Sequence, residues 1–192
     1  MSVHWSLKAV GKMVQNLKYI RKELNIVKKK HILLLAAIGI FFCLLIITKQ
    51  KKETQFILKN LQHLDQVQIN FVYDGDTFRT STGERIRLIG IDTPEMNWEE
   101  GNPEFFAREA YEYARENLLW KKVYLEYDQE RRDKYNRTLV YLYLADGTFF
   151  NQKLIEEGYA SLLLIPPNLK HSEALKKAEE RVQDSGLGIW GK

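Results

Sequence analysis

Residues 32–48, with the sequence ILLLAAIGIFFCLLIIT, form a run of 17 residues without a charged side chain. Lys28, Lys29 and Lys30 precede this run, and three more lysines fall within the four residues after it. As a helix, the run would be about 25 Å long at ~1.5 Å per residue, close to the ~30 Å hydrocarbon core of a bilayer. The flanking lysines can extend their charged ends to the interfaces. The run therefore predicts a transmembrane anchor and confines the globular part of the chain to the residues after it.

A buried helix of a soluble domain and a cleaved signal peptide are the two alternatives for this run. A helix that is apolar all round at this length rarely serves a small domain. A signal peptide would have an apolar region of roughly 7–15 residues that ends in small residues. Here the run continues into TKQKKET, which offers no such cleavage site. We therefore expect an anchor that is not cleaved.

Charge predicts the orientation of the anchor and the character of the domain. Residues 1–30 carry eight Lys or Arg and one acid, which places the N-terminus in the cytoplasm by the positive-inside rule. The domain would then lie on the non-cytoplasmic side, periplasmic or extracellular in a bacterium. Residues 1–52 have 11 basic and one acidic residue, a net of +10, whereas residues 53–192 have 18 and 24, a net of −6. An acidic domain argues against a broad electrostatic surface for polyanions, so any phosphate would be bound by a few placed arginines.

The basic segment 1–31 has apolar residues at helical spacing between positions 5 and 27. A basic amphipathic helix on the inner leaflet is one interpretation, and a partly ordered cytoplasmic stub is the other. A start at Met13 would shorten this segment. The single cysteine, Cys43, excludes an intrachain disulfide and a thiolate metal cluster, and the four histidines lack ligand spacing.

Residues 49–65 are expected to be a short helix or linker, and the domain proper spans residues 66–192. Strands are predicted from period-two apolar patterns, and helices from 3.6-residue periodicity with Gly158 and Gly186 as stops. Asn102 is expected to be the N-cap of the first helix. The predicted strands are 66–73, 77–81, 84–91, 121–128, 137–148 and 159–165, and the predicted helices are 102–120, 150–158 and 171–186. This order indicates an α+β domain, and we expect a five-stranded OB-type β-barrel with about three helices.

Two strands end in acidic residues. YDGDTF places Asp74 and Asp76 after the first strand, where Asp-Gly is typical of a tight turn and paired carboxylates are typical of a divalent-cation site. RLIGIDTPE places Asp92 and Glu95 at the exit of a later strand. If these strands pair, the carboxylates of Asp76, Asp92 and Glu95 come together. With a backbone carbonyl and water molecules they would form a plausible calcium site.

Two arginines complete a reactive set. Arg87 leads into Asp92, and Arg137 begins the most apolar strand. Guanidinium groups match phosphate oxygens in a bidentate way. A cation, a carboxylate base and two arginines are the groups that hydrolysis of a phosphodiester requires.

The motifs YDGDTF, RLIGIDTPE, DKYNR, NQKLIEEGYA and GLGIW resemble, in this order, those of the staphylococcal-nuclease-like (thermonuclease) family. The resemblance covers about residues 66–190. It implies an OB-type barrel and calcium-dependent hydrolysis of DNA and RNA that leaves 3′-phosphate ends.

The resemblance also implies a role for each matching residue. Asp76, Asp92 and the Thr93 carbonyl would bind calcium, with Asp74 supporting the metal loop from behind. Glu95 would be the base that activates water, and Arg87 and Arg137 would stabilise the transition state. Lys134 and Tyr135 would lie beside the bound nucleotide.

Two positions depart from the family pattern. Asn136 stands where the family usually has glycine, and asparagine tolerates the left-handed backbone that would present Arg137. Leu164 and Pro166 stand near positions where some members have tyrosines that stack on a base. Because stacking contributes ~1–3 kcal/mol per base, we expect weaker or differently selective binding of nucleic acid.

Two other functions remain as alternatives: an OB-type module that binds nucleic acid or protein without cleavage, and a membrane-tethered calcium-binding structural domain. The complete charged set favours the enzyme. The expected partners are nucleic acid and, through residues 32–48, membrane lipid. We expect a monomer, and the sequence implies no protein partner.

Overall fold

The computed structural model describes residues 12–18, 21–22, 40–41, 44–52, 55–57 and 59–191. The chain divides into two units, residues 1–53 and 54–192. All described residues of the first unit are helical. Most of the predicted anchor and of the predicted amphipathic segment lies outside the described residues. Within the described ranges, no helix combines the length and the apolar character that crossing a membrane requires.

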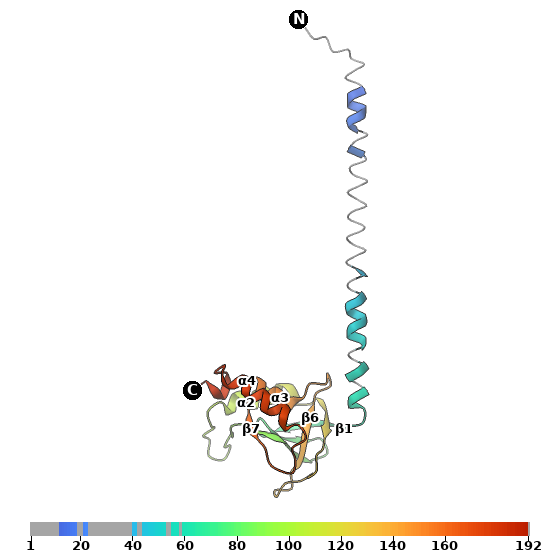
Figure 1. Ribbon diagram of the computed structural model, residues 1–192. Helices are drawn as coiled ribbons and strands as arrows, with labels where there is room; N and C mark the ends of the chain where they lie inside the picture. The colour runs from blue at the N-terminus through green and yellow to red at the C-terminus, as the bar shows by residue number, and fades with distance from the viewer. Residues whose placement is uncertain are drawn as a thin grey trace. The chain divides into compact units, whose positions relative to one another are not determined.

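The second unit is built around a closed barrel of five strands, joined in the order β1-β2-β3-β6-β5 (Figure 1). The strands are β1 (Asp65–Val72), β2 (Thr77–Thr80), β3 (Arg85–Leu88), β5 (Lys122–Glu126) and β6 (Thr138–Tyr143). All neighbouring pairs are antiparallel except β3 and β6, which are parallel. This closed arrangement is consistent with the predicted OB-type barrel.

Alternation along the strands sends one set of side chains into the barrel. Phe78 of β2 and Ile86 of β3 pair directly across the two strands, and both are fully buried. The same core includes Ile69, Val140 and Leu125 from the other strands. Consequently Thr77, Arg79, Arg85 and Arg87 share the outer face of β2 and β3.

A β-bulge in β1 changes the predicted pattern of that strand. Ile69 pairs with Thr80 and Phe71 with Arg79, so the register shifts between Ile69 and Phe71. The extra residue reverses the alternation. As a result Val72 is buried and Phe71 is exposed, whereas the sequence pattern predicted that Ile69 and Phe71 share the apolar face.

The strand predicted at 84–91 is two strands. After β3 the chain breaks at Gly90, whose φ of +81° belongs to the left-handed region. A Cβ atom at this position would lie 2.5 Å from Leu175 Cδ1, so glycine also permits close packing. The following strand, β4 (Gly90–Asp92), leaves the barrel and pairs with β7 (Ser161–Leu163). This break places Asp92 on the β4–β7 pair, opposite Ser161, instead of on a barrel strand.

The predicted helix at 102–120 begins later than expected. Helix α2 spans Ala107–Leu118, and its N-cap is Phe106 with a left-handed backbone rather than Asn102. The reason is that Glu104 is used elsewhere: its backbone N–H donates to the Glu95 carbonyl, which holds residues 95–104 as a loop. Ala107, Ala110, Ala114 and Leu118 form the buried face of the helix.

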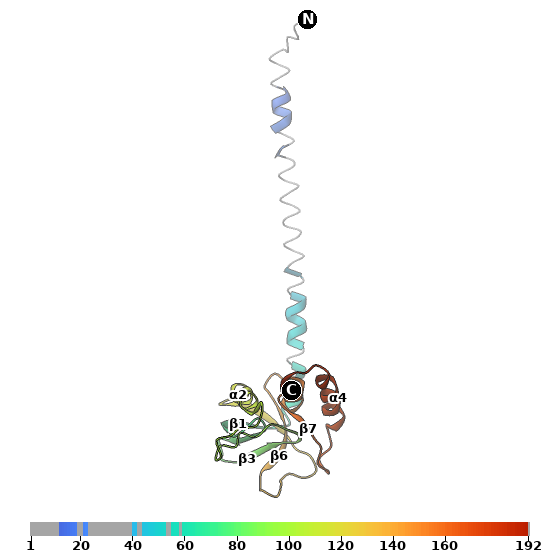
Figure 2. The ribbon, with the colours of Figure 1, turned by 90° about the vertical axis from the view of Figure 1, so that its left-hand side faces the viewer.

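The remaining helices follow the predicted order. Helix α3 (Phe150–Glu156) packs against α4 (Ser172–Gln183), and a short 3-10 helix, η1 (Gly188–Trp190), follows. Figure 2 shows α2 on one flank of the barrel and α4 on the other. Residues 55–57 and 59–61, within the segment predicted as a short helix or linker, are helical, and Leu61 is buried.

Candidate active site

Asp74 shapes the turn between β1 and β2. Its Oδ1 accepts hydrogen bonds from the backbone N–H groups of Asp76 (3.1 Å) and Thr77 (2.6 Å). Gly75 lies directly against Thr93, because a Cβ atom added at Gly75 would be 2.7 Å from Thr93 Cγ2. The side chain of Asp74 therefore sets the turn, and Gly75 lets the turn approach the segment after β4.

Asp76 joins that turn to the segment after β4. It is almost fully buried. Its Oδ2 accepts hydrogen bonds from the backbone N–H of Thr93 (2.8 Å) and from the Thr93 hydroxyl (3.0 Å). Its Oδ1 accepts one from the Thr77 hydroxyl (3.1 Å). The two acidic motifs are thus in direct contact, as the sequence analysis predicted.

Arg87 lies between the two predicted metal-binding aspartates. Its Nη1 forms an ion pair with Asp76 Oδ2, and its Nη2 donates to Asp92 Oδ1 at 2.6 Å. The Arg87 side chain is only 11% exposed, whereas the Asp92 side chain is 50% exposed. One guanidinium group therefore neutralises carboxylates from two segments, one buried and one open to solvent.

Burial controls the electrostatics of the two aspartates in the first turn. Removal from water raises the pKa of Asp76 to about 7, against the opposing attraction of Arg87, and the negative charge of Asp74 raises it further. Burial also raises the pKa of Asp74. A cation close to these carboxylates would favour their charged forms.

Glu95 lies in the exposed loop after β4. Its backbone N–H donates to Glu104 Oε2 at 2.9 Å, and its carbonyl accepts from the Glu104 N–H at 3.0 Å. Partial burial, followed by repulsion from Asp76, raises the pKa of the Glu95 carboxyl. A raised pKa makes Glu95 a stronger base. Glu104 was predicted to lie in a helix, so its contact with Glu95 was missed, and no spacing in the sequence indicates this contact.

Arg137 is positioned by a turn that begins at Asp133. Asp133 Oδ1 accepts from the backbone N–H groups of Tyr135 and Arg137, and Asp133 Oδ2 accepts from Arg137 Nε at 2.6 Å. Asn136 adopts φ +63°, as its predicted left-handed conformation requires. Asp133 was not among the predicted site residues. The signal for it was present, because an Asp that begins a turn commonly bonds the backbone two residues on.

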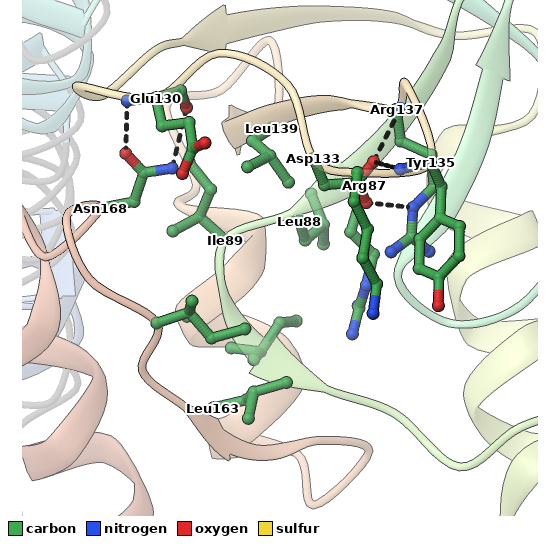
Figure 3. A pocket seen from close by; sticks show the side chains of 14 residues that line it. Arg87, Leu88, Ile89, Glu130, Asp133, Tyr135, Arg137, Leu139, Leu163 and Asn168 are labelled. Carbon is green, nitrogen blue, oxygen red and sulfur yellow. Dashed lines mark hydrogen bonds and ion pairs between the residues drawn. The ribbon is translucent and has the colours of Figure 1, made fainter.

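A pocket of about 380 Å³ brings the two arginines together. Figure 3 shows Arg87, Tyr135 and Arg137 grouped on one side of it, with Ile89, Leu139 and Leu163 on the other. Lys134 also lines the pocket. Leu164 and Pro166 were expected near the positions where some family members have stacking tyrosines. The pocket is lined instead by their neighbours Leu163 and Ile165.

Arg87 connects the carboxylates of Asp76 and Asp92 with this pocket. Asp92 and Thr93 line a different pocket, together with Glu104, and Asp76 and Glu95 line neither of the two. Arg87 lines the first pocket and contacts Asp76 and Asp92. The structure therefore unites Asp74, Asp76, Arg87, Asp92 and Thr93 in one network and places Arg137, Lys134 and Tyr135 around the adjoining pocket.

The donor set at this network suits a hard cation. Asp76 and Asp92 offer only oxygen atoms, which calcium prefers, and their carboxylates converge on one positive group. Across the described part of the chain, however, no group of three or more His, Cys, Asp and Glu side chains is arranged to hold a metal ion. Two carboxylates with the Thr93 carbonyl would be the protein ligands, and the three clustered carboxylates of the sequence prediction are not seen.

A closed five-stranded barrel with an acid and arginine network at the exit of β3 defines this protein as an OB-type barrel with a candidate phosphate site. The family model described as staphylococcal nuclease homologue matches residues 85–192, more than half of the chain. The chain therefore belongs to the staphylococcal nuclease homologue family.

Individual relatives agree with this assignment. The chain is 39% identical over 122 residues to a thermonuclease of Staphylococcus intermedius, which covers 62% of this chain and 72% of the relative. It is 31% identical over 150 residues to the endonuclease YncB of Bacillus subtilis strain 168, covering 76% and 70%. It is 32% identical over 136 residues to the SPbeta prophage-derived endonuclease YokF of the same strain, covering 68% and 46%.

Proposed function

We propose that this chain is a calcium-dependent nuclease that hydrolyses DNA and RNA, leaves 3′-phosphate ends and is tethered to a membrane. The observation that carries the proposal is the position of Arg87, which contacts Asp76 and Asp92 and lines the same pocket as Arg137. The names of the relatives, thermonuclease and endonuclease, support the same class of reaction.

The two arginines would bind the phosphate that is attacked. Each guanidinium is held by a carboxylate, Arg87 by Asp76 and Asp92 and Arg137 by Asp133, so each is oriented before substrate arrives. Fixed positive groups of this kind stabilise the negative charge that builds on the phosphate oxygens in the transition state. Lys134 and Tyr135 line the pocket beside them and would contact the nucleotide.

Glu95 would accept the proton of the attacking water. Its raised pKa brings the carboxylate closer to the working pH, where a general base is most effective. Glu104 holds the backbone of Glu95 at both its N–H and its carbonyl and so orients the base. The alcohol that leaves would take a proton from solvent, and the phosphate would remain on the other product as a 3′-phosphate.

Asp76, Asp92 and the Thr93 carbonyl would hold calcium, with Asp74 fixing the turn that presents Asp76. When bound, calcium supplies positive charge that polarises the phosphate and offsets its developing charge. Asp76 is restrained by both Thr93 hydrogen bonds, which ties the two ligand segments into one unit.

Incubation of the purified full-length chain with plasmid DNA and with RNA tests this function. We expect cleavage with calcium, none with a chelator, and 3′-phosphate ends that a phosphatase removes. Binding of nucleic acid without cleavage under all conditions would instead identify a binding module.

The membrane tether rests on the uncharged run at 32–48. Its described residues Ile40, Phe41 and Leu44–Ile47 are strongly exposed, between 46% and 63%, and an exposed apolar surface of this kind calls for an apolar environment. We propose that the N-terminus is cytoplasmic and the nuclease domain non-cytoplasmic. Protease added to intact cells should then remove the domain, and protection of the domain until the cells are lysed would refute this orientation.

A further inference from the structure

Four residues on the outer side of the barrel form what we call the arginine–aromatic strip: Phe71 of β1, Tyr73 directly after it, Arg79 of β2 and Arg85 of β3. Phe71 pairs with Arg79 across β1 and β2, and Arg79 pairs with Arg85 across β2 and β3. Opposite residues in an antiparallel pair share a face. The strip is therefore one row of side chains that crosses three strands on the solvent side of the barrel.

Each arginine of the strip rests on an aromatic ring. The guanidinium carbon of Arg79 lies 5.1 Å from the centre of the Phe71 ring, and that of Arg85 lies 4.4 Å from the centre of the Tyr73 ring. The two rings pack edge to face at 4.8 Å between centroids. Such stacking restricts a guanidinium group while leaving its N–H donors open on the outer side.

Neither arginine of the strip forms an ion pair with any carboxylate in the described residues, whereas Arg87, Arg132 and Arg137 all do. The nearby acid, Glu84, is already bound by Arg132 at 3.2 Å and by the Thr138 hydroxyl at 2.5 Å. Residues 53–192 carry 24 acids against 18 Lys and Arg, so carboxylate partners are plentiful. Two stacked arginines without a carboxylate in such a domain favour an external anion as their partner.

The strip is continuous with the candidate active site. Arg85 and Arg87 lie two residues apart on β3, about 7 Å along the strand, and on the same face. Tyr135 lines the pocket with Arg87 and Arg137, and it also lines a second pocket with Arg85. Tyr135 is 67% exposed and belongs to the lining of both pockets, so its side chain connects the surface at Arg87 with the surface at Arg85.

We propose that the arginine–aromatic strip binds the phosphates that flank the attacked phosphate of a single-stranded nucleic acid, which rests on the nuclease function proposed above. Arg79 Nε donates to Asn70 Oδ1 at 3.3 Å, but neither guanidinium group of the row has a carboxylate partner among the described residues. One row of two such groups matches the phosphates of a single backbone. A duplex would bring a second backbone against the rest of the domain, which is acidic. There, few Lys or Arg side chains would neutralise its phosphates and release their counterions, so the second backbone would add little binding free energy. Single strands bound without sequence preference commonly use positive groups together with aromatic rings in this way.

The test is binding of the full-length chain to fluorescently labelled decathymidylate, measured by anisotropy in a chelator that prevents cleavage. The Arg79→Gln/Arg85→Gln variant should bind at least about tenfold more weakly. The slope of log Kd against log salt should fall by about 1.4, because each phosphate contact on a single strand contributes ~0.7. The Arg79→Lys/Arg85→Lys variant should keep the salt slope, since it keeps both charges.

Arg131 provides a matched control. It also stacks on a ring, with its guanidinium carbon 4.2 Å from the Tyr127 centroid, but the pocket that it lines with Glu126 and Lys170 includes no residue of the strip. The Arg131→Gln variant should bind decathymidylate within about twofold of the wild type. Circular dichroism and thermal melting of every variant separate loss of binding from loss of fold.

The outcomes are decisive. Unchanged affinity and salt slope in the double variant, or an equal loss in Arg131→Gln, would overturn the strip. A larger loss for a ten-base-pair duplex than for decathymidylate would overturn its assignment to single strands. Failure of the wild type to cleave nucleic acid with calcium would instead refute the proposed nuclease function, because the binding measurement does not depend on cleavage.

Discussion

At the residue scale, Arg87 connects the parts of the site, because its guanidinium holds Asp76 and Asp92 and lines the pocket with Arg137. Its functional and structural contributions can be separated by substitution. Lysine would keep the charge but lose the two-sided fork, whereas methionine would leave the buried Asp76 without its charged partner.

We expect Arg87→Lys to lower kcat by roughly 10²–10³-fold, because the positive group that stabilises the transition state would be misplaced. Arg87→Met should in addition lower the free energy of unfolding by about 3–5 kcal/mol, since a buried charge loses its counterion. Urea unfolding and steady-state kinetics measure the two effects. A folded Arg87→Lys variant with wild-type kcat would show that Arg87 serves only the fold.

Asn136 gives a second prediction at the residue scale. Its backbone has φ +63°, and its carbonyl and side-chain oxygens accept from Arg132 at 3.1 Å. We expect Asn136→Gly to stay within about 1 kcal/mol of the wild-type stability, and Asn136→Val to cost about 1–2 kcal/mol because a side chain with a branched Cβ resists this conformation. Thermal melting checks the ranking, and equal stability of the two variants would contradict it.

At the element scale, hydrogen bonds between residues far apart in sequence hold the segment before α4 to the barrel. Glu126 at the end of β5 accepts from Lys170 Nζ (2.5 Å), contacts His171 Nε2 (2.7 Å) and accepts from the Tyr143 hydroxyl (2.8 Å). Burial acts to raise the pKa of Glu126, but these three hydrogen bonds outweigh it and lower the pKa. This cluster ties the segment before α4 to β5 and β6.

The lowered pKa of Glu126 predicts how the stability of the domain depends on pH. Because the pKa of Glu126 is lower in the folded than in the unfolded state, its stabilisation is complete above the ordinary glutamate value near 4.5 and is lost as the pH falls through the folded value. We expect Glu126→Gln to lower the melting temperature at pH 7 and to show less further loss on acidification below pH 4.5. Glu130→Gln, a neighbouring exposed acid, is the control. Parallel melting curves for wild type and Glu126→Gln across this pH range would contradict the assignment.

Local sequence patterns predicted the elements of the domain but not how they meet. The STGE hairpin turn and helices α3 and α4 could be predicted because turn residues and periodicity act over short distances. The bulge after Ile69 and the break at Gly90 could not, since each depends on the partner strand or on Leu175. The predicted start of α2 was wrong for the same reason: the backbone N–H and the side chain of Glu104 both bond Glu95, which keeps residues 95–104 in a loop.

The candidate site shows the same division. The aspartates could be predicted to converge because Asp76 and Asp92 each follow a strand of one hairpin region, and Thr93 and Arg87 do join them. Of the groups that orient the reactive side chains, Asp133 could have been found from its place at the start of a turn before Arg137. The contact of Glu104 with Glu95 could not, because it depends on the conformation of the loop between them.

At the scale of the whole molecule, an acidic domain that acts on a polyanion must concentrate its positive charge. The network at Arg87, the pocket at Arg137 and the arginine–aromatic strip lie along one continuous surface that includes the outer face of β3. A basic segment and an uncharged run precede the domain, which would keep the proposed nuclease at a membrane and away from the nucleic acid of its own cytoplasm. Both features follow from the same separation of charge along the chain.

The proposed role of Glu95 as the base of a calcium-dependent nuclease is tested by the cleavage rate of the Glu95→Gln variant of the full-length chain on single-stranded DNA with calcium. Glu99→Gln is the matched control, since Glu99 is an exposed acid in the same loop. We predict that Glu95→Gln lowers kcat by about 10²–10⁴-fold, as expected for loss of a general base, while Glu99→Gln stays near the wild type and both melt normally. Wild-type cleavage by a folded Glu95→Gln variant, or no cleavage by the wild type with calcium, would contradict the account.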